Sequence, residues 1–190
     1  MKQSRVVVPG VVTLIMLGAV LASSAPASAV LVLKAGGQVA PVGTPVIGVL
    51  AQEPCDRFES SGTLTANSSS IDRAKFSSTA HTGAGCGEGG PLISGPVVGD
   101  RLKETGQFVV LTNWTYTTVL APGAVNTKCT YTVRMLHGKF TIPGPTQATV
   151  SGKGKRTATS PTNCPEKLAV DYFQAKLYDA ETNELFEAEL

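Results

Sequence analysis

Residues 107–120 (QFVVLTNWTYTTVL) restrict the fold more than any other segment, because their side chains alternate between two faces with the two-residue period of a β-strand. One face carries Phe108, Val110, Thr112, Trp114, Tyr116 and Leu120, and the other carries Val109, Leu111, Asn113, Thr115, Thr117 and Val119. A long strand with apolar residues on both faces lies centrally in a sheet or bends between two sheets. Residues 128–136 place Cys129, Tyr131, Val133 and Met135 on one face, and turn-forming residues separate the two segments, which predicts a long hairpin.

Shorter segments rich in Thr, Val, Tyr and Phe show the same alternation, whereas helical periodicity is nearly absent. These expected strands are residues 31–34, 45–51, 62–66, 74–80, 139–142, 148–152 and 168–178. The Gly-rich residues 82–96 and the polar residues 157–165 are expected to be irregular. About nine strands separated by turns predict an all-β fold, an antiparallel β-sandwich, with a β-barrel as the alternative. For residues 180–190 we favour a strand with Phe186, Ala188 and Leu190 facing inward over a helix.

The N-terminus has the three parts of a secretory signal peptide. Two basic residues precede a mostly apolar run, residues 6–22, and small residues then lead to Ala27-Ser28-Ala29, which fits the cleavage rule. An uncleaved membrane anchor is disfavoured, because a Pro-Gly pair interrupts the run and a span needs ~20 apolar residues. We therefore predict that residues 1–29 are a cleaved signal peptide. Residues 30–190 are expected to form a single β domain that is secreted and extracellular, with no stable membrane anchor.

All four cysteines, Cys55, Cys86, Cys129 and Cys164, follow the predicted cleavage site, as expected for disulfides formed in an oxidising compartment. Three pairings are open, and we favour Cys55–Cys86 with Cys129–Cys164 because each bond closes a local loop. Each bond closes a loop of about 30–35 residues, which adds ~3–4 kcal/mol to the free energy of unfolding on the chain-entropy account. The cysteines and histidines lack the spacing of metal ligands, so we expect no metal, and no cofactor motif is present.

The expected mature chain carries no net charge, since the signal removes two basic residues and leaves 14 basic against 14 acidic ones. A nucleic-acid-binding surface needs a basic excess or a clustered basic face. The one basic cluster, Lys153, Lys155 and Arg156, is interpreted as a solvated strand end or turn. We therefore expect no nucleic-acid partner.

Catalytic motifs are mostly rejected on spacing, so we assign no catalytic, cofactor-binding or metal residue. The glycines of residues 83–90 lack the following helix of a dinucleotide-binding loop. His81 and His137 are expected to be surface loop residues, because His81 borders the Gly-rich stretch, His137 precedes Gly138 at an expected turn, and no G-x-S-x-G nucleophile elbow is present. Trp114, the only tryptophan, is expected to pack in the core rather than stack on sugars. A calcium site from the loop acids Asp56, Glu59 and Asp72 is a weaker alternative.

The layout of the whole chain resembles secreted proteins of uncharacterised function from high-GC Gram-positive bacteria. The resemblance rests on the Ala-rich signal, the opening VLVLK at 30–34, the strand entry GTPV at 43–46, and two widely spaced Cys pairs within Thr-rich β segments. It implies no activity and no site residues.

The function expected from the sequence is a secreted, non-enzymatic β-sandwich module. It would bind an extracellular protein or glycan, or associate with the cell envelope, through loops or a sheet edge. The alternatives are a secreted hydrolase with an unrecognised His or carboxylate site, and a disulfide-stapled proteinase inhibitor.

Overall fold

The computed structural model describes residues 30–52, 56–68, 70–72, 78–82, 92–120 and 126–190, which form fourteen β-strands and no helix. The all-β fold predicted from the alternation is confirmed. The strands are β1 Val32–Ala35, β2 Gln38–Val39, β3 Pro45–Gln52, β4 Asp56–Thr63, β5 Ser70–Asp72, β6 Ser78–Thr82, β7 Leu92–Ser94, β8 Val97–Lys103, β9 Gln107–Leu120, β10 Thr127–Lys139, β11 Gly144–Pro145, β12 Gln147–Arg156, β13 Lys167–Asp179 and β14 Glu187–Glu189.

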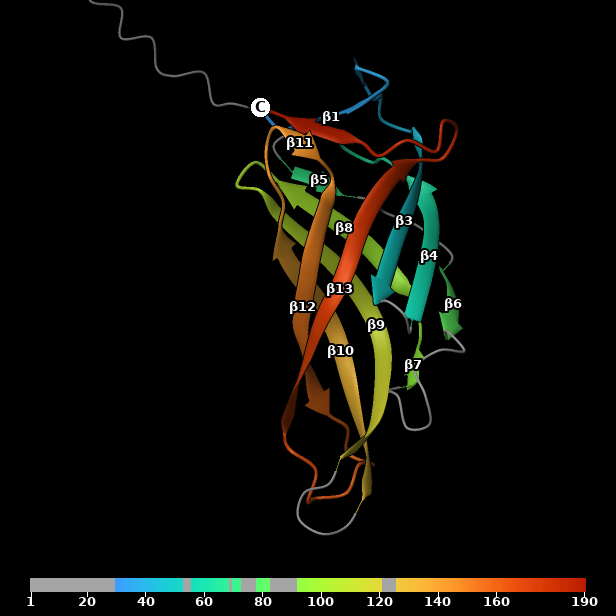
Figure 1. The fold of residues 1–190 in the computed structure, drawn as a ribbon, viewed down its shortest axis with the longest axis vertical. Helices are drawn as coiled ribbons and strands as arrows, with labels where there is room; N and C mark the ends of the chain where they lie inside the picture. The colour runs from blue at the N-terminus through green and yellow to red at the C-terminus, as the bar shows by residue number, and fades with distance from the viewer. Residues whose placement is uncertain (1–29, 53–55, 69, 73–77, 83–91, 121–125) are drawn as a thin grey trace, which may run out of the picture.

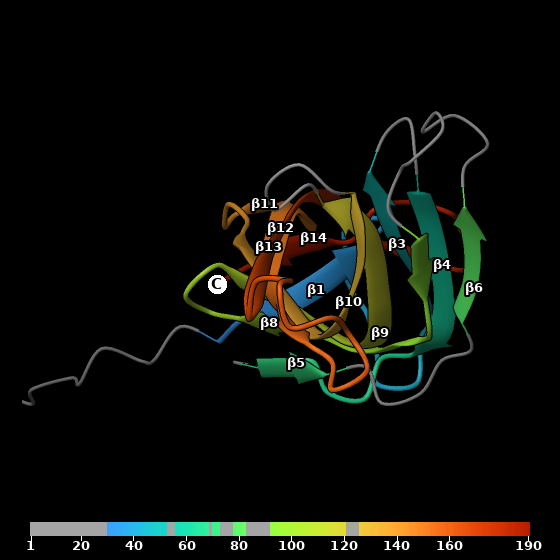
Figure 2. The same ribbon diagram turned by 90° about the horizontal axis from the view of Figure 1, so that it is seen from below.

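Ten of these strands form one antiparallel sheet with the order β5-β8-β9-β10-β12-β13-β3-β4-β6, and β7 pairs with β9 beside this path. Figure 1 shows that the sheet curls, so that β12, β13, β3 and β4 lie in front of β8, β9 and β10. The view along the strands in Figure 2 shows the same curl as an incomplete ring. One curled sheet thus supplies both walls of the core, which corrects the expected sandwich of two sheets packed face to face and agrees better with the barrel alternative.

The aromatic core demonstrates the curl directly. Trp114 on β9 lies 4.6 Å from Phe58 on β4 and 5.4 Å from Phe173 on β13, measured between ring centroids. β9 and β4 are separated by four strands in the sheet order, so their side chains meet only because the sheet folds back over itself. All three rings are at most 1% exposed. The expectation that Trp114 packs in the core is confirmed.

A second, four-stranded sheet with the order β11-β14-β1-β2 closes one end of the curl (Figure 2). Its inward residues Leu33, Phe186 and Ala188 are fully buried in the main core. Thr146 connects the two sheets, because its buried hydroxyl donates toward the carbonyl oxygens of Leu177 and Phe186, both 3.0 Å away. Of the strand predicted over residues 180–190, only Glu187–Glu189 forms one; the expected inward direction is confirmed for Phe186 and Ala188 and is wrong for Leu190, which is exposed.

The predicted hairpin of residues 107–120 and 128–136 is confirmed as β9 and β10, which pair from Thr127↔Leu120 to Lys139↔Gln107. The face prediction fails at Met135, which is exposed, whereas Leu136 is buried. Irregular registers between β10 and both of its neighbours explain the change. A β-bulge adds one residue to a strand, and one extra residue reverses the faces of all that follow.

The other strand predictions differ in outcome. Residues 31–34, 45–51, 148–152 and 168–178 lie in or largely overlap β1, β3, β12 and β13. Residues 62–66 only overlap the end of β4, and residues 139–142 follow β10 without forming a separate strand. Residues 157–165 form turns and coil as expected. β7 lies within residues 82–96, so the expectation that this stretch is irregular is wrong there, and β8 was not predicted. Residues 74–77 and most of the Gly-rich stretch 82–96 lie outside the described residues.

The predicted disulfide Cys129–Cys164 is confirmed, with a Cα–Cα distance of 5.8 Å and 35 residues between its ends along the chain. It joins the start of β10 to the loop before β13 and packs with buried Tyr131. Such a bond is compatible with an extracellular location. Cys55 and Cys86 lie outside the described residues.

Candidate functional site

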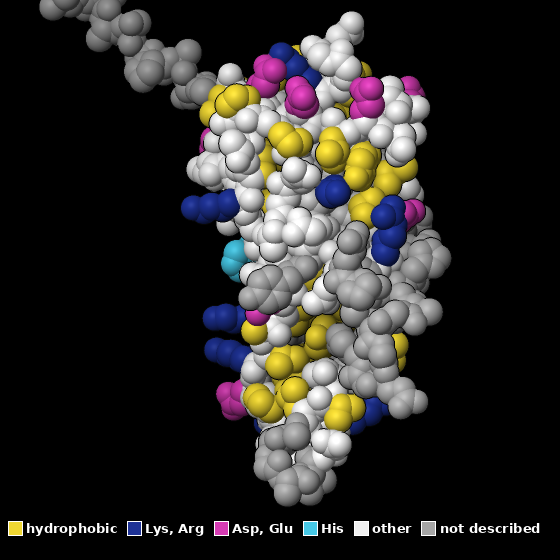
Figure 3. Space-filling model, in the orientation of Figure 1, with side chains coloured by type: hydrophobic (Ala, Val, Ile, Leu, Met, Phe, Trp, Pro, Cys, Tyr) yellow, Lys and Arg dark blue, Asp and Glu magenta, His cyan; other side chains and the backbone are white. Residues whose placement is uncertain are grey.

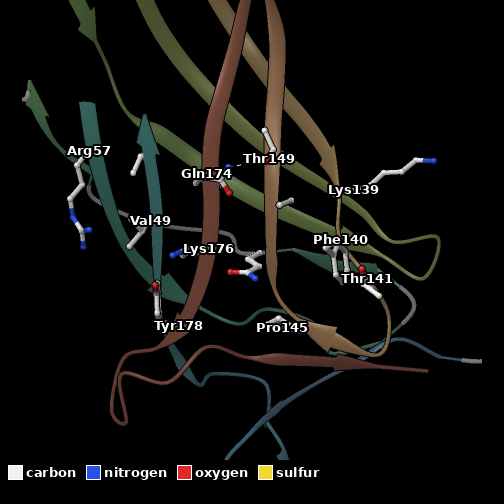
Figure 4. Close-up of a pocket in the computed structure, with 13 residues that line it drawn as sticks. Val49, Arg57, Lys139, Phe140, Thr141, Pro145, Thr149, Gln174, Lys176 and Tyr178 are labelled. Carbon is white, nitrogen blue, oxygen red and sulfur yellow. Dashed lines mark hydrogen bonds between the residues drawn. The ribbon is translucent and has the colours of Figure 1, made fainter. Parts of the chain in front are cut away.

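A groove lies on the outer face of the large sheet, across β12, β13, β3 and the start of β4 (Figure 4). Its volume is about 610 Å³, within the range of ~300–1,000 Å³ that is typical of ligand pockets. Val49 on β3 lines it, whereas Val46 and Leu50 of the same strand belong to the core. The groove therefore uses the face of the sheet that points away from the core, as the two-residue period requires.

The strand registers arrange the lining residues in rows. One row runs Thr149, Gln174, Ala51 and Arg57 across four strands, because each is the pairing partner of the next. In the neighbouring row, Lys176 stands between Gln147 and Val49. Side chains that are directly opposite across strands have Cβ atoms about 5 Å apart. The short side chains of Ala51 and Val49 on β3 lie beside the long side chains of Gln174, Lys176 and Arg57 on the neighbouring strands, and the groove lies among them.

The groove is polar and basic. The amide of Gln174 donates to the Thr149 hydroxyl at 2.8 Å, which fixes both groups across its floor. Three cations, Arg57, Lys139 and Lys176, line the groove, and no carboxylate is found among its described lining residues. Figure 4 shows Arg57 and Lys139 at opposite sides with Lys176 between them. Arg57 also donates to Glu59 at 2.7 Å, next to the groove, and both of these side chains are largely exposed.

The groups that line this groove can make hydrogen bonds and charge contacts with a ligand. Its described lining offers amide, hydroxyl, ammonium and guanidinium groups beside the apolar Val49, Ala51 and Pro145. Its described lining contains no Ser, Cys, His, Asp or Glu, and it does contain Lys, Thr and Tyr, which can also serve as bases or nucleophiles. The groups present can hold a polar, negatively charged ligand by hydrogen bonds and charge.

The basic cluster expected at a strand end divides into two parts. Lys153 and Lys155 are exposed on the outer face of β12, as the solvated strand end predicts. Arg156 has a structural role, because its Nη1 donates to the carbonyl oxygens of Thr162 and Cys164, both at 2.7 Å. Arg156 thereby holds the loop that carries the disulfide. Figure 3 shows Lys and Arg side chains projecting in a column along the edge of the molecule, over β10 and β12.

Neither histidine is among the described residues that line the groove, although His81 extends the row Thr149, Gln174, Ala51 and Arg57 by one strand. His137 is exposed, as expected, but it lies within β10 and pairs with Val109 and Ser151 rather than in a loop. The backbone of His81 pairs with Arg57 at the β4–β6 edge, so it is also in a strand, and its side chain is outside the described part.

The acids considered for calcium do not form a described metal site. Glu59 faces Arg57, while Asp56 and Asp72 belong to β4 and β5, which are not neighbours in the sheet. Within the described ranges, no group of three His, Cys, Asp or Glu residues is placed to hold a metal ion.

Two buried polar atoms lack a hydrogen-bond partner among the described residues, Nε1 of Trp114 and the hydroxyl of Tyr131. Tyr131 lies beside the disulfide and is fully buried. Burial raises the pKa of its phenol above 10.0, and the nearby Arg156 guanidinium opposes part of this increase.

Sequence reasoning missed the groove, because its residues come from six strands, β3, β4, β10, β11, β12 and β13, that only the sheet topology brings together. A signal was present, since β13 alternates buried Phe173, Ala175 and Leu177 with polar Gln174 and Lys176. That pattern marks an outward polar face but does not reveal its neighbours.

No helix in the described ranges is long and apolar enough to cross a membrane. No family model matches the chain, and neither a curated protein nor a solved structure matches it.

Proposed function

We propose that the protein is a secreted, non-enzymatic binding module that holds a glycan in the groove on the outer face of the large sheet. The single observation that carries this proposal is the composition of the groove, in which amide, hydroxyl and cationic groups surround a small apolar floor. A few fixed polar groups beside apolar surface are the usual means by which a pocket orients a ligand. Gln174 and Thr149, held together by their own hydrogen bond, are positioned to meet sugar hydroxyls.

A glycan is favoured over a protein partner because the groove is open and mostly polar. Large apolar side chains, which dominate the binding energy of protein interfaces, are few there. Secretion is supported by the predicted signal at residues 1–29 and by the Cys129–Cys164 bond. A second bond, Cys55–Cys86, remains part of the proposal.

The test measures retention of the protein, purified from culture medium, on a panel of immobilised neutral and acidic polysaccharides. The groove variant is Gln174→Ala with Lys176→Ala. The matched control is Asn113→Ala with Thr115→Ala, which are exposed on the outer face of β9 on the other wall. We expect the wild type and the control to be retained by at least one polymer, and the groove variant to lose retention by tenfold or more.

Three results would contradict the proposal. They are an absence of retention on every polymer, equal retention of the groove variant, and shortening of a retained polymer, measured by size-exclusion chromatography. The last result would instead favour the hydrolase alternative, and His81→Ala or His137→Ala would then show whether a histidine takes part.

A further inference from the structure

The groove continues into a basic strip, which we define as Lys153 and Lys155 on β12 and Lys167 on β13. All three side chains are exposed. On the same face of β12, Thr149 lines the groove and lies six residues from Lys155, a distance of ~20 Å along a strand. The outer face of β12 therefore leads directly from the groove to the strip.

The orientation of the strip is fixed by the glycines between its lysines. Gly152 and Gly154 point inward and are buried. A Cβ at Gly152 would lie 2.4 Å from the carbonyl oxygen of Met135, and one at Gly154 would lie 2.9 Å from Cβ of Tyr131. Only glycine fits at these inward positions, so the two faces of β12 cannot be exchanged. The lysines must point outward, and they follow each other at ~6.7 Å along the strand.

The strip places positively charged lysines next to one another on neighbouring strands. Lys155 and Lys167 are direct pairing partners on one face, an arrangement that destabilises a sheet by itself. None of the three lysines has an ion pair with a described residue, and Glu166 is the one described carboxylate in the hollow of about 450 Å³ that they line. Asp and Glu side chains gather mainly at the opposite end, near β14, as Figure 3 shows. A bound anion would relieve the repulsion between the lysines.

We propose that the ligand is a linear acidic polysaccharide, with one segment in the groove and its following charged units on the basic strip. This inference rests on the proposed function and specifies the ligand that the groove accepts. Regularly spaced cations match a polymer with regularly spaced anions, whereas a single small anion would need only one of the two regions. The strip and the described outward residues Thr149 and Ser151 that lead to it offer no aromatic ring for bases to stack on, so an acidic polysaccharide fits this part of the surface better than a single-stranded nucleic acid.

The experiment compares two matched pairs of polymers by biolayer interferometry. Polygalacturonate is compared with its methyl ester, and dextran sulfate with dextran, so that carboxylate and sulfate recognition are separated; single-stranded DNA is the third probe. The strip variant is Lys153→Gln with Lys155→Gln. The control, Lys34→Gln with Lys103→Gln, removes the same charge from β1 and β8, away from the strip.

We expect an acidic polymer to bind more tightly than its neutral partner, and the strip variant to lose about tenfold in affinity, as for two exposed ion contacts. The control should retain wild-type affinity, and raising the salt concentration should weaken binding. Equal binding of the charged and neutral polymers, or equal losses in the strip variant and the control, would overturn the inference. If the strip inference fails in either of these ways but the Gln174→Ala, Lys176→Ala variant still loses polymer binding, the proposed function of the groove stands. Tighter binding of DNA than of either acidic polymer would also overturn the inference, and binding to no polymer would overturn both proposals.

Discussion

Replacing Tyr131 with Phe should stabilise the protein. The phenol ring is fully buried beside the Cys129–Cys164 bond, and its hydroxyl has no partner among the described residues. A buried polar group without a hydrogen bond costs ~1–3 kcal/mol, and Tyr131→Phe removes the hydroxyl while keeping the ring. We therefore expect the free energy of unfolding at pH 7 to rise by ~1–2 kcal/mol, because the oxygen also gives up some van der Waals contact.

The same variant should change how stability depends on pH. Burial raises the pKa of Tyr131 above the value of 10.0 that it has in the unfolded chain, and Arg156 opposes this only in part. Above pH 10 the unfolded state releases this proton before the folded state does, so the wild type loses stability as the pH rises. The loss is limited to ~1.4 kcal/mol per pH unit and ends once the pH passes the folded pKa. Tyr131→Phe lacks this contribution, so its advantage should widen above pH 10.

Urea unfolding followed by the fluorescence of Trp114, at pH 7, 9, 10 and 11, measures both effects. Tyr178→Phe is the control, because Tyr178 is only half-buried and lies in the groove, so its stability at pH 7 should stay within ~0.5 kcal/mol. A loss of 1 kcal/mol or more in Tyr131→Phe at pH 7 would refute the reasoning, since the hydroxyl would then make a favourable bond. A difference in the free energy of unfolding between Tyr131→Phe and the wild type that does not change with pH would refute the argument that burial raises the pKa of Tyr131.

Three further substitutions test how the fold is held together, each by its urea unfolding midpoint. Removing the disulfide with Cys129→Ala and Cys164→Ala should cost ~4 kcal/mol, from a 35-residue separation; a loss below 1 kcal/mol would mean that the loop stays ordered without the bond. Gly152→Ala should cost ~3 kcal/mol, because its methyl group meets the Met135 carbonyl at 2.4 Å, and an unchanged midpoint would show that β12 can shift. Thr146→Val should cost ~1–2 kcal/mol by removing the hydroxyl that joins the two sheets, and a stabilised variant would contradict that role.

Local patterns predicted the strands whose alternation is long and uninterrupted. Residues 107–120 were assigned to a strand with the bounds of β9, because its inward residues recur at every second position over the whole segment. β8 was missed, since Gly99, Asp100 and Arg101 break the apolar pattern of Val97–Lys103, and Asp100 is nevertheless buried. Met135 was assigned to the wrong face because a bulge depends on the pairing of β10 with its neighbours, which the residues of one strand do not encode.

Short-range alternation along the chain predicts antiparallel β structure. Local loop closure favours the Cys129–Cys164 bond over the other pairings without excluding them, and the structure confirms both expectations. The curl that brings Trp114 against Phe58, and the groove that Arg57, Gln174 and Thr149 line together, follow from the arrangement of the strands in three dimensions. These residues lie up to 117 positions apart along the chain. The curl and the groove depend on strand order and register, which are set by how the whole apolar surface is buried rather than by any single segment.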